Sequence, residues 1–118
     1  MLPKPEPMQA KSRSFDLKTR LDWGEPALTI VDVRDLNSFN DSHIQGAISL
    51  PIETLVERAS VNLEKNRDIY VYGETAEQAE EAVNQLREAG YINLSELVGG
   101  LEGWKAVGYP VETITRAK

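Results

Sequence analysis

The sequence predicts an α/β domain in which helices cover both faces of a parallel sheet. Two runs, 28–33 and 69–72, are rich in β-branched and aromatic residues and almost continuously apolar. Such runs are typical of strands that are covered on both faces. Segments with helical apolar spacing alternate with these strands, and the connections are too short for separate domains. The alternation therefore indicates one parallel sheet.

The first half of the chain contributes three expected strands and two expected helices. Residues 15–23 have helical spacing, with Ser14 as the expected cap and Gly24, followed by Pro26, as the expected end. The strand over 28–33 comes next. Residues 47–50 predict a short strand closed by Pro51, and residues 52–63 predict a helix with apolar positions at 52, 55, 56, 59 and 63. The strand over 69–72 follows.

The strongest helix signal begins at Thr75. Thr75 and Gln78 fit a capping box, in which each side chain bonds the backbone N–H of the other residue. An apolar stripe follows, and Gly90 stands where a left-handed residue is expected to end the helix. Residues 93–98 then predict a short strand, and residues 101–107 predict a last helix that ends at Gly108.

The N-terminal residues 1–10 predict an extended or disordered tail, because Pro3, Pro5 and Pro7 alternate there. The alternative is a proline motif that binds a partner. Residues 11–118 are expected to form a single domain. The start lacks the apolar core of a signal peptide, and no run approaches the roughly 20 apolar residues of a membrane span. We therefore expect a cytoplasmic protein that does not bind a membrane.

Composition excludes several kinds of chemistry. The 118 residues include no Cys, one His and a net charge of −6. Without Cys the chain has no disulfide, no thiolate metal site and no cysteine nucleophile, and one His makes an imidazole metal site a poor expectation. We expect no metal and no cofactor. The acidic balance argues against a nucleic-acid partner, because such partners usually need a basic face.

A binding site is expected at one edge of the sheet. Ligands of open parallel sheets bind outside the carboxyl ends of the strands. Four segments follow strands in this sequence: 34–35, 50–51, 73–78 and 99–100. These segments define the predicted rim.

Five segments of the chain resemble the rhodanese-like domain family in their order and spacing. They are IVDVR at 30–34, SHIQGAI at 42–48, IYVY at 69–72, AGYIN at 89–93 and VGGLEGWKAVGYPV at 98–111. The resemblance covers roughly residues 14–111. It implies a three-layer α/β/α sandwich around a five-stranded parallel sheet.

The resemblance also implies a reaction. Active members of this family are sulfurtransferases, whose loop after the fourth strand reads roughly Cys-x-x-Gly-x-Arg-Ser. The thiolate of that Cys takes up a sulfur atom as a persulfide, and loop N–H groups at the start of the next helix stabilise the negative sulfur.

This sequence departs from the family loop at four positions. Gly73 stands at the nucleophile position, Ala76 at the loop glycine, Gln78 at the arginine and Ala79 at the serine. A single engineered change at position 73 would have left the other three alone. The loop therefore resembles a naturally degenerate site that still has the six-residue length of the sulfurtransferases.

Charges around the loop have two interpretations. Residues 74–88 hold five acids and one arginine. Glu74 and Glu77 would oppose an anionic sulfur donor, but acids in a first helical turn also favour the helix dipole. Thr75 has no neighbouring base in the sequence and is expected to be occupied as a cap.

Other polar and aromatic residues have structural alternatives. Arg34 either reaches the rim or pairs with Asp32 or Glu53, and we favour the pair. His43 is expected to brace a turn rather than to transfer protons, and Trp23 and Trp104 are expected to pack rather than to hold a ligand.

We expect a non-catalytic rhodanese-like domain that acts as a binding or regulatory module for a protein partner. Its candidate binding residues follow in sequence order: Arg34, Gly73, Glu74, Thr75, Ala76, Glu77 and Gln78. One alternative is an enzyme of different chemistry that uses Glu74, Glu77 and Arg34. Another is an accessory subunit of a sulfur relay whose partner supplies the Cys. The sequence leaves the oligomeric state open.

Overall fold

The computed structural model describes residues 4–24 and 27–114 and has a central sheet of five parallel strands. The strands are β1 (Lys11–Ser12), β2 (Leu28–Asp32), β4 (Ile48–Ser49), β5 (Asp68–Tyr72) and β6 (Asn93–Leu97). Their order across the sheet is β1-β6-β5-β2-β4. In the register, Ile30 lies beside Tyr70 and Tyr70 beside Ser95. The predicted parallel sheet of about five strands is confirmed.

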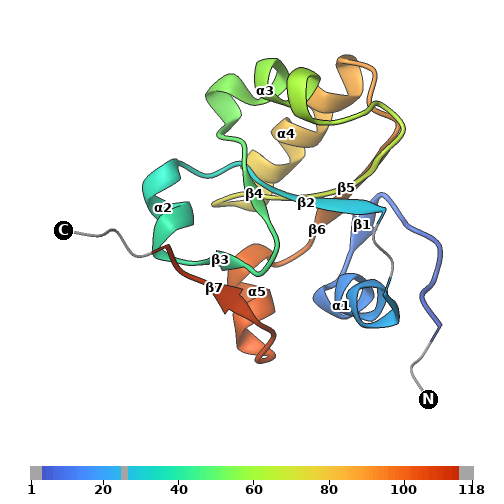
Figure 1. Ribbon diagram of the computed structural model, residues 1–118, viewed down its shortest axis with the longest axis vertical. Coiled ribbons are helices and arrows are strands. Elements are labelled where there is room, and N and C mark those ends of the chain that lie inside the picture. Colours follow the sequence, from blue (N-terminus) through green and yellow to red (C-terminus); the bar gives the residue numbers. More distant parts are fainter. Residues whose placement is uncertain (1–3, 25–26, 115–118) are drawn as a thin grey trace.

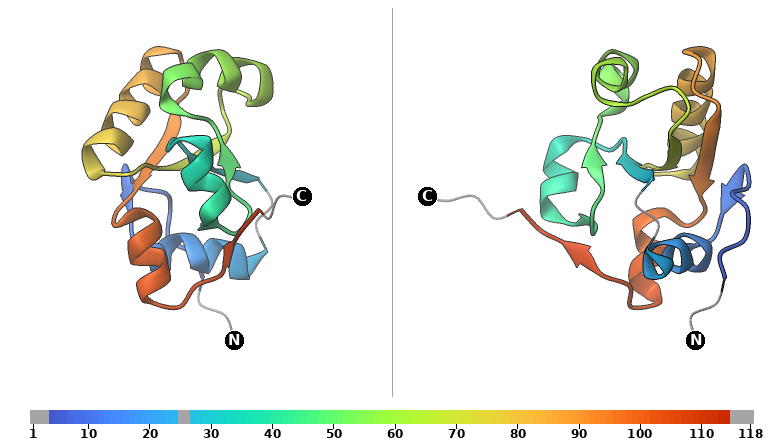
Figure 2. Two further views of the ribbon diagram at one scale, coloured as in Figure 1. Left: turned by 90° about the vertical axis from the view of Figure 1, so that its left-hand side faces the viewer. Right: turned by 45° about the vertical axis from the view of Figure 1, so that its right-hand side comes forward.

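Helices cover both faces of this sheet, as expected for three layers (Figures 1 and 2). Helices α3 (Leu55–Asn62) and α4 (Ala76–Glu88) lie on one face, and α1 (Ser14–Trp23) and α5 (Gly100–Ala106) lie on the other. A short 3₁₀ turn, η1 (Ile52–Thr54), leads into α3. Helix α2 (Leu36–Asp41) lies beside a small antiparallel pair, β3 (His43–Ile44) and β7 (Val111–Glu112).

Two apolar clusters form the core, one on each face of the sheet. Alternation along β5 divides them, because Ile69 and Val71 join the cluster under α3 and α4, whereas Tyr70 and Tyr72 join the cluster with α1 and α5. Trp104 is fully buried in the second cluster, and its indole N–H donates to the carbonyl oxygen of Pro110 at 2.7 Å. This confirms its predicted packing role. Trp23, expected to pack, is instead 47% exposed.

Several expectations need correction. Arg13, not Ser14, is the residue that caps α1, and the first turn of the predicted helix over 52–63 is η1 rather than α-helix. Helix α2 and the strands β1, β3 and β7 were not expected. Gly24 ends α1 in the left-handed conformation with φ of 90°, as predicted, whereas Pro26 lies outside the described residues.

The tail is partly seen. Residues 4–10 contain no helix or strand, and residues 1–3, with Pro3, lie outside the described residues. Met8 packs against the second apolar cluster, and the carbonyl oxygen of Ala10 accepts the N–H of Glu96 at 2.9 Å. The domain boundary at residue 11 stays a prediction.

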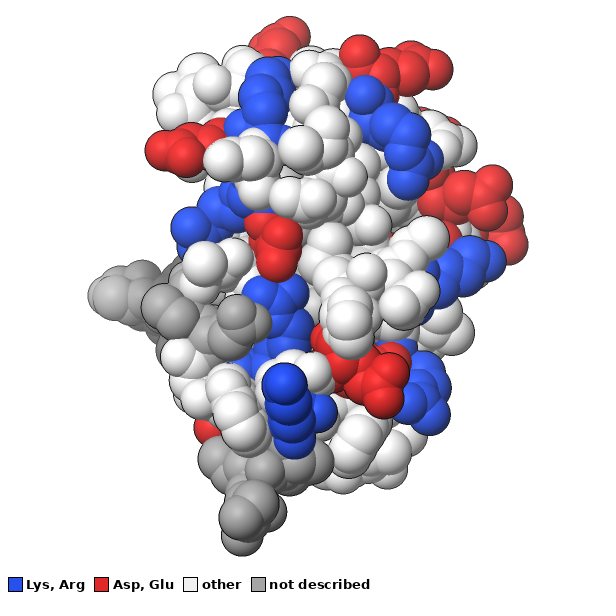
Figure 3. Space-filling model, turned by 90° about the vertical axis from the view of Figure 1, so that its right-hand side faces the viewer, with Lys and Arg blue, Asp and Glu red and all other residues white. Residues whose placement is uncertain are grey.

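The surface mixes charges of both signs. On the face shown in Figure 3, acidic and basic side chains lie interspersed among uncharged ones. Within the described ranges, no helix has both the length and the apolar character needed to cross a bilayer.

Candidate functional site

Two strand ends meet at the predicted rim and enclose a small cavity. The loop after β5 and the turn after β6 face each other across a space of about 160 Å³. Its walls come from these two segments and from the end of β6: Gly73, Glu74, Thr75, Ala76, Ala79, Glu96, Leu97, Val98, Gly99 and Gly100. The cavity therefore lies at the carboxyl edge of the sheet, where ligands of such folds bind.

The loop over 73–78 holds its own N–H groups. Thr75 Oγ1 accepts the backbone N–H of Gln78 at 3.1 Å, which caps α4 as predicted. The Gln78 side chain folds back into the loop, and its Oε1 accepts the N–H of Glu74 at 2.7 Å. The predicted capping box is therefore only half correct, because Gln78 bonds the residue before the cap rather than Thr75 itself.

The folded-back amide takes the space beside Gly73. A Cβ atom added to Gly73 would lie 2.7 Å from Gln78 Oε1 and 3.2 Å from the backbone nitrogen of Ala79. A side chain at position 73 therefore has to displace Gln78. The loop forms a turn, and the N–H of Glu74 donates to the side-chain oxygen of Gln78 instead of being free for a ligand.

The opposite wall is a turn of two glycines. Gly99 and Gly100 have φ of 84° and 53°, in the left-handed region that favours glycine. A Cβ on Gly100 would be 3.5 Å from the carbonyl oxygen of Gly73, an ordinary van der Waals contact. The two walls thus approach closely, and the expected role of these glycines in a tight turn is confirmed.

Glu96 lines the cavity from β6, and the predicted rim did not include it. It is only 7% exposed. Within residues 4–24 and 27–114, no group donates a hydrogen bond to its carboxylate and no cation pairs with it. The sequence did carry a signal, because an acid interrupts the buried run of β6 between Ser95 and Leu97.

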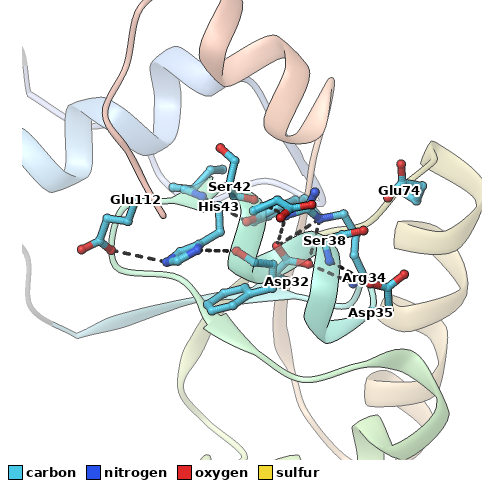
Figure 4. A network of polar contacts seen from close by, with 12 residues as sticks. Asp32, Arg34, Asp35, Ser38, Ser42, His43, Glu74 and Glu112 are labelled. Atoms are coloured by element: carbon cyan, nitrogen blue, oxygen red, sulfur yellow. Dashed lines mark hydrogen bonds and ion pairs between the residues drawn. The ribbon is translucent and has the colours of Figure 1, made fainter. Parts of the chain in front are cut away.

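Next to the cavity, Arg34 is held by Asp32 (Figure 4). Arg34 Nε and Nη2 donate to the Asp32 carboxylate at 3.1 and 2.7 Å, and Nη2 also donates to the carbonyl oxygen of Ser42 at 2.6 Å. Burial lowers the pKa of Arg34, but the bond to Asp32 and its charge outweigh burial and raise it overall. The predicted pair with Asp32 forms.

Tyr72 and His43 extend this network toward α2 and β7. The Tyr72 hydroxyl accepts the N–H of Ile44 at 3.1 Å. Burial, and then the charge of Asp32, raise the pKa of Tyr72. His43 Nδ1 lies 2.7 Å from the carbonyl oxygen of Phe39, its ring stacks on Phe39, and its Nε2 is 3.6 Å from Glu112 Oε1. His43 therefore braces the corner between α2 and β7, as expected.

The predicted binding residues do not all lie together. Gly73, Glu74, Thr75 and Ala76 line the 160 Å³ cavity. Arg34 instead borders a smaller hollow of about 50 Å³ that it shares with Gly73 and Glu74. Glu77 is exposed on the first turn of α4 and lines neither space. In Figure 4, Glu74 stands apart from the Asp32 and Arg34 network, with no bond to it.

Other hollows and possible ligand clusters do not join this site. A space of about 590 Å³ lies between β4 and α3, where Leu50 contributes to the wall together with Arg58 and Arg67. Leu50 of the predicted rim therefore faces a different part of the surface. Over the part of the chain that the structure describes, no three His, Asp or Glu side chains come together as a metal site would require.

Comparison with known proteins gives the same family for sequence and fold. The family model described as "Rhodanese-like domain" matches residues 16–107. The Alr3790 protein from Anabaena sp. has a crystal structure with a TM-score of 0.87 and 59% sequence identity, covering 89% of this chain and 94% of that one.

Three curated relatives carry different names. Thiosulfate sulfurtransferase GlpE of Tolumonas auensis is 32% identical over 72% of this chain and 78% of its own length. The HTH-type transcriptional regulator Rv0324 of Mycobacterium tuberculosis is 36% identical over 82% of this chain. The putative sulfur carrier protein YrkF of Bacillus subtilis is 28% identical over 74%. The matched regions span only 42% of Rv0324 and 46% of YrkF.

Proposed function

The chain belongs to the rhodanese-like domain family, and on that premise we propose that it is a non-catalytic binding or regulatory module without sulfurtransferase activity of its own. The observation that carries the proposal is the absence of any Cys in 118 residues, together with Gly73 at the nucleophile position. Sulfur transfer by this fold needs a thiolate to take up the sulfur. The proposal includes a single domain over 11–118, a cytoplasmic location and a protein partner.

The loop offers no substitute nucleophile. Thr75 is its one hydroxyl residue, and its oxygen already accepts the N–H of Gln78. Among the described residues, no His or Lys lines the cavity to act as a base for Thr75. The Gln78 amide also occupies one N–H group that would otherwise be free to stabilise an anion.

The names of the relatives support a fold that serves several roles. Sulfurtransferase, sulfur carrier and transcriptional regulator all occur among proteins similar to this chain. The match covers less than half the length of YrkF and of Rv0324. In those two proteins the rhodanese-like region is therefore one part of a longer chain. A binding or regulatory role needs the fold and the rim but not the thiolate.

The test is a sulfur-transfer assay. The purified chain is incubated with thiosulfate or mercaptopyruvate and with cyanide, and thiocyanate is measured. The GlpE of Tolumonas auensis serves as the positive control and the heat-denatured chain as the blank. We expect no turnover above the blank. Turnover that rises with the concentration of the folded chain would overturn the proposal.

The two alternative functions have less support. An enzyme based on Glu74, Glu77 and Arg34 would need these groups to converge, but Glu77 lies outside the cavity and Arg34 is bound to Asp32. A sulfur-relay subunit would have to receive an anionic persulfide beside Glu74 and Glu96, where like charges oppose it. Unchanged ligand-induced stabilisation in the double variant E74Q/E77Q would remove the first alternative.

A further inference from the structure

Glu96 is a buried acid without a partner. It is the fourth residue of β6 and lies beside Val71 of β5 and Lys11 of β1 in the parallel register. Lys11 is exposed, and no ion pair joins it to Glu96 in the described part of the chain. Glu96 as a whole residue is 7% exposed, and an acid held this far from solvent is costly unless a cation or hydrogen-bond donors compensate its charge. The charge of Glu96 therefore has no compensating group within the described chain. The cavity that Glu96 lines has room for such a group from outside.

The cavity has the composition of a site for a long cationic side chain. The acids Glu96 and Glu74 both line it, while Ala76, Ala79 and Val98 give small apolar walls. Its volume of about 160 Å³ is several times the ~30 Å³ that one water occupies in the liquid. Lysine and arginine combine an aliphatic stem with a charged end and lay the stem along apolar surface.

We infer that this cavity binds the lysine or arginine side chain of a protein partner, with the cation at Glu96 and the stem between the two loop walls. The inference rests on the proposed function, since it names the kind of partner that the module takes. The site would then have reversed its preference relative to the sulfurtransferases, from an anionic sulfur to a cation. The proposed binding of the cation is electrostatic, and no covalent bond forms or breaks.

A protein side chain fits better than a free ion because the cavity opens onto apolar surface. Val98 lines the cavity and is 49% exposed, so it can contact the chain that delivers the cation. An anion is disfavoured, because no described Lys, Arg or His lines the 160 Å³ space, and Arg34, which borders the adjoining hollow, is already neutralised by Asp32.

The test uses three blocked pentapeptides that differ only in their central residue: arginine, lysine or citrulline. Citrulline has nearly the shape of arginine but no charge. Binding to the full chain is measured by titration calorimetry, and the site by shifts of the backbone amide signals in NMR spectra. We expect a cationic peptide to bind about tenfold or more tightly than the citrulline peptide and to shift the signals of 73–76 and 96–100.

Two matched variants test the role of Glu96. E96Q keeps the size of the side chain and should lower the affinity for the cationic peptide about tenfold or more. E88Q makes the same change of charge at the far, exposed end of α4 and should leave the affinity within about twofold. If E96Q alters folding, the comparison of arginine with citrulline on the unmodified chain still decides the question.

Several outcomes would overturn the inference. These are equal affinity for the arginine and citrulline peptides, an equal loss of affinity in E96Q and E88Q, or no binding of any peptide at concentrations up to about 10 mM. Free agmatine binding as tightly as the arginine peptide would assign the cavity to a small molecule instead. None of these results depends on sulfur transfer. The sulfur-transfer assay therefore tests the proposed function independently of the peptide titrations.

Discussion

The ends of β2 and β5 lie at the same edge of the sheet but differ in what holds them. At the end of β2, the buried pair of Asp32 and Arg34 is closed by several hydrogen bonds and by contacts to α2 and β3. At the end of β5, the loop keeps its turn and its helix cap, but the reactive position is Gly73. The difference teaches that the polar network that shapes this edge and the group that performs chemistry there are physically separate.

The largest expected effect lies at the β2 corner. Asp32→Asn removes one charge from a buried pair whose side chains are 0% and 10% exposed, and leaves Arg34 without a counter-charge. We expect the free energy of unfolding to fall by roughly 3 kcal/mol or more. Urea unfolding followed by circular dichroism measures it. The control is D22N, which breaks the surface pair with Lys18 and should cost less than about 1 kcal/mol. Equal losses of stability in the two variants would show that the buried pair contributes no more than the surface pair.

The next effect concerns Tyr72, which supports the same corner. Tyr72→Phe leaves the buried N–H of Ile44 without its acceptor and should cost about 1–3 kcal/mol in the same unfolding measurement. A loss below about 0.3 kcal/mol would contradict the assigned bond, since that is within the error of such comparisons.

The pH dependence gives this variant a second readout. Burial raises the pKa of Tyr72, so the unfolded chain releases this proton first, near pH 10. Stability that is fully present below about pH 10 should therefore fall as the pH rises further, and the fall should be shallower in Tyr72→Phe. An identical slope in both proteins between about pH 10 and 11 would contradict the raised pKa.

A smaller effect is expected at the β5 loop. Thr75→Ala removes the oxygen that caps α4 and should lower the free energy of unfolding by about 1 kcal/mol. Thr54 precedes α3 at the same position, but its side chain makes no capping bond. Thr54→Ala therefore serves as the matched control and should change stability by a few tenths of a kcal/mol at most. The reverse order of the two variants would contradict the assigned cap.

The smallest effect is expected where the family has its nucleophile. Gly73→Cys places a side chain against Gln78 Oε1, and the amide has to move and give up its bond to Glu74. We expect a loss of about 1 kcal/mol or less and almost no sulfur transfer from thiosulfate to cyanide, because positions 76, 78 and 79 remain altered. Substantial thiocyanate formation by this single variant would show that the cysteine alone defines the site.

Local patterns were enough for the long elements of the fold. Strands β2 and β5 carry nearly continuous apolar runs and helix α4 carries an apolar stripe, and these signals lie within the element itself. Strands β1, β3 and β7 have two residues each, and they exist only through partners far along the chain, such as Lys11 with Glu96 and Ile44 with Val111. Helix α2 has six residues and a single buried one, Phe39, so its stripe is too short to recognise.

The site was predictable in place but not in detail. The resemblance located the loop and the glycine turn that faces it. It could not show that Gln78 turns inward to Glu74, because side-chain direction in a loop depends on the space around it. The predicted rim consists of segments that follow strands, whereas Glu96 lies within β6, so the prediction did not include it.

The folded-back amide of Gln78 also bears on how such a loop changes over evolutionary time. With glycine at position 73 the amide can settle into the loop, and once it has settled, a returning cysteine meets it at 2.7 Å. Replacing Gln78 first gives up the bond to the Glu74 N–H and gains no reactivity. Each single step back toward a sulfurtransferase therefore carries a cost without a benefit. The side chain of Gln78, five residues along the chain from Gly73, therefore makes the return of a cysteine at position 73 unfavourable.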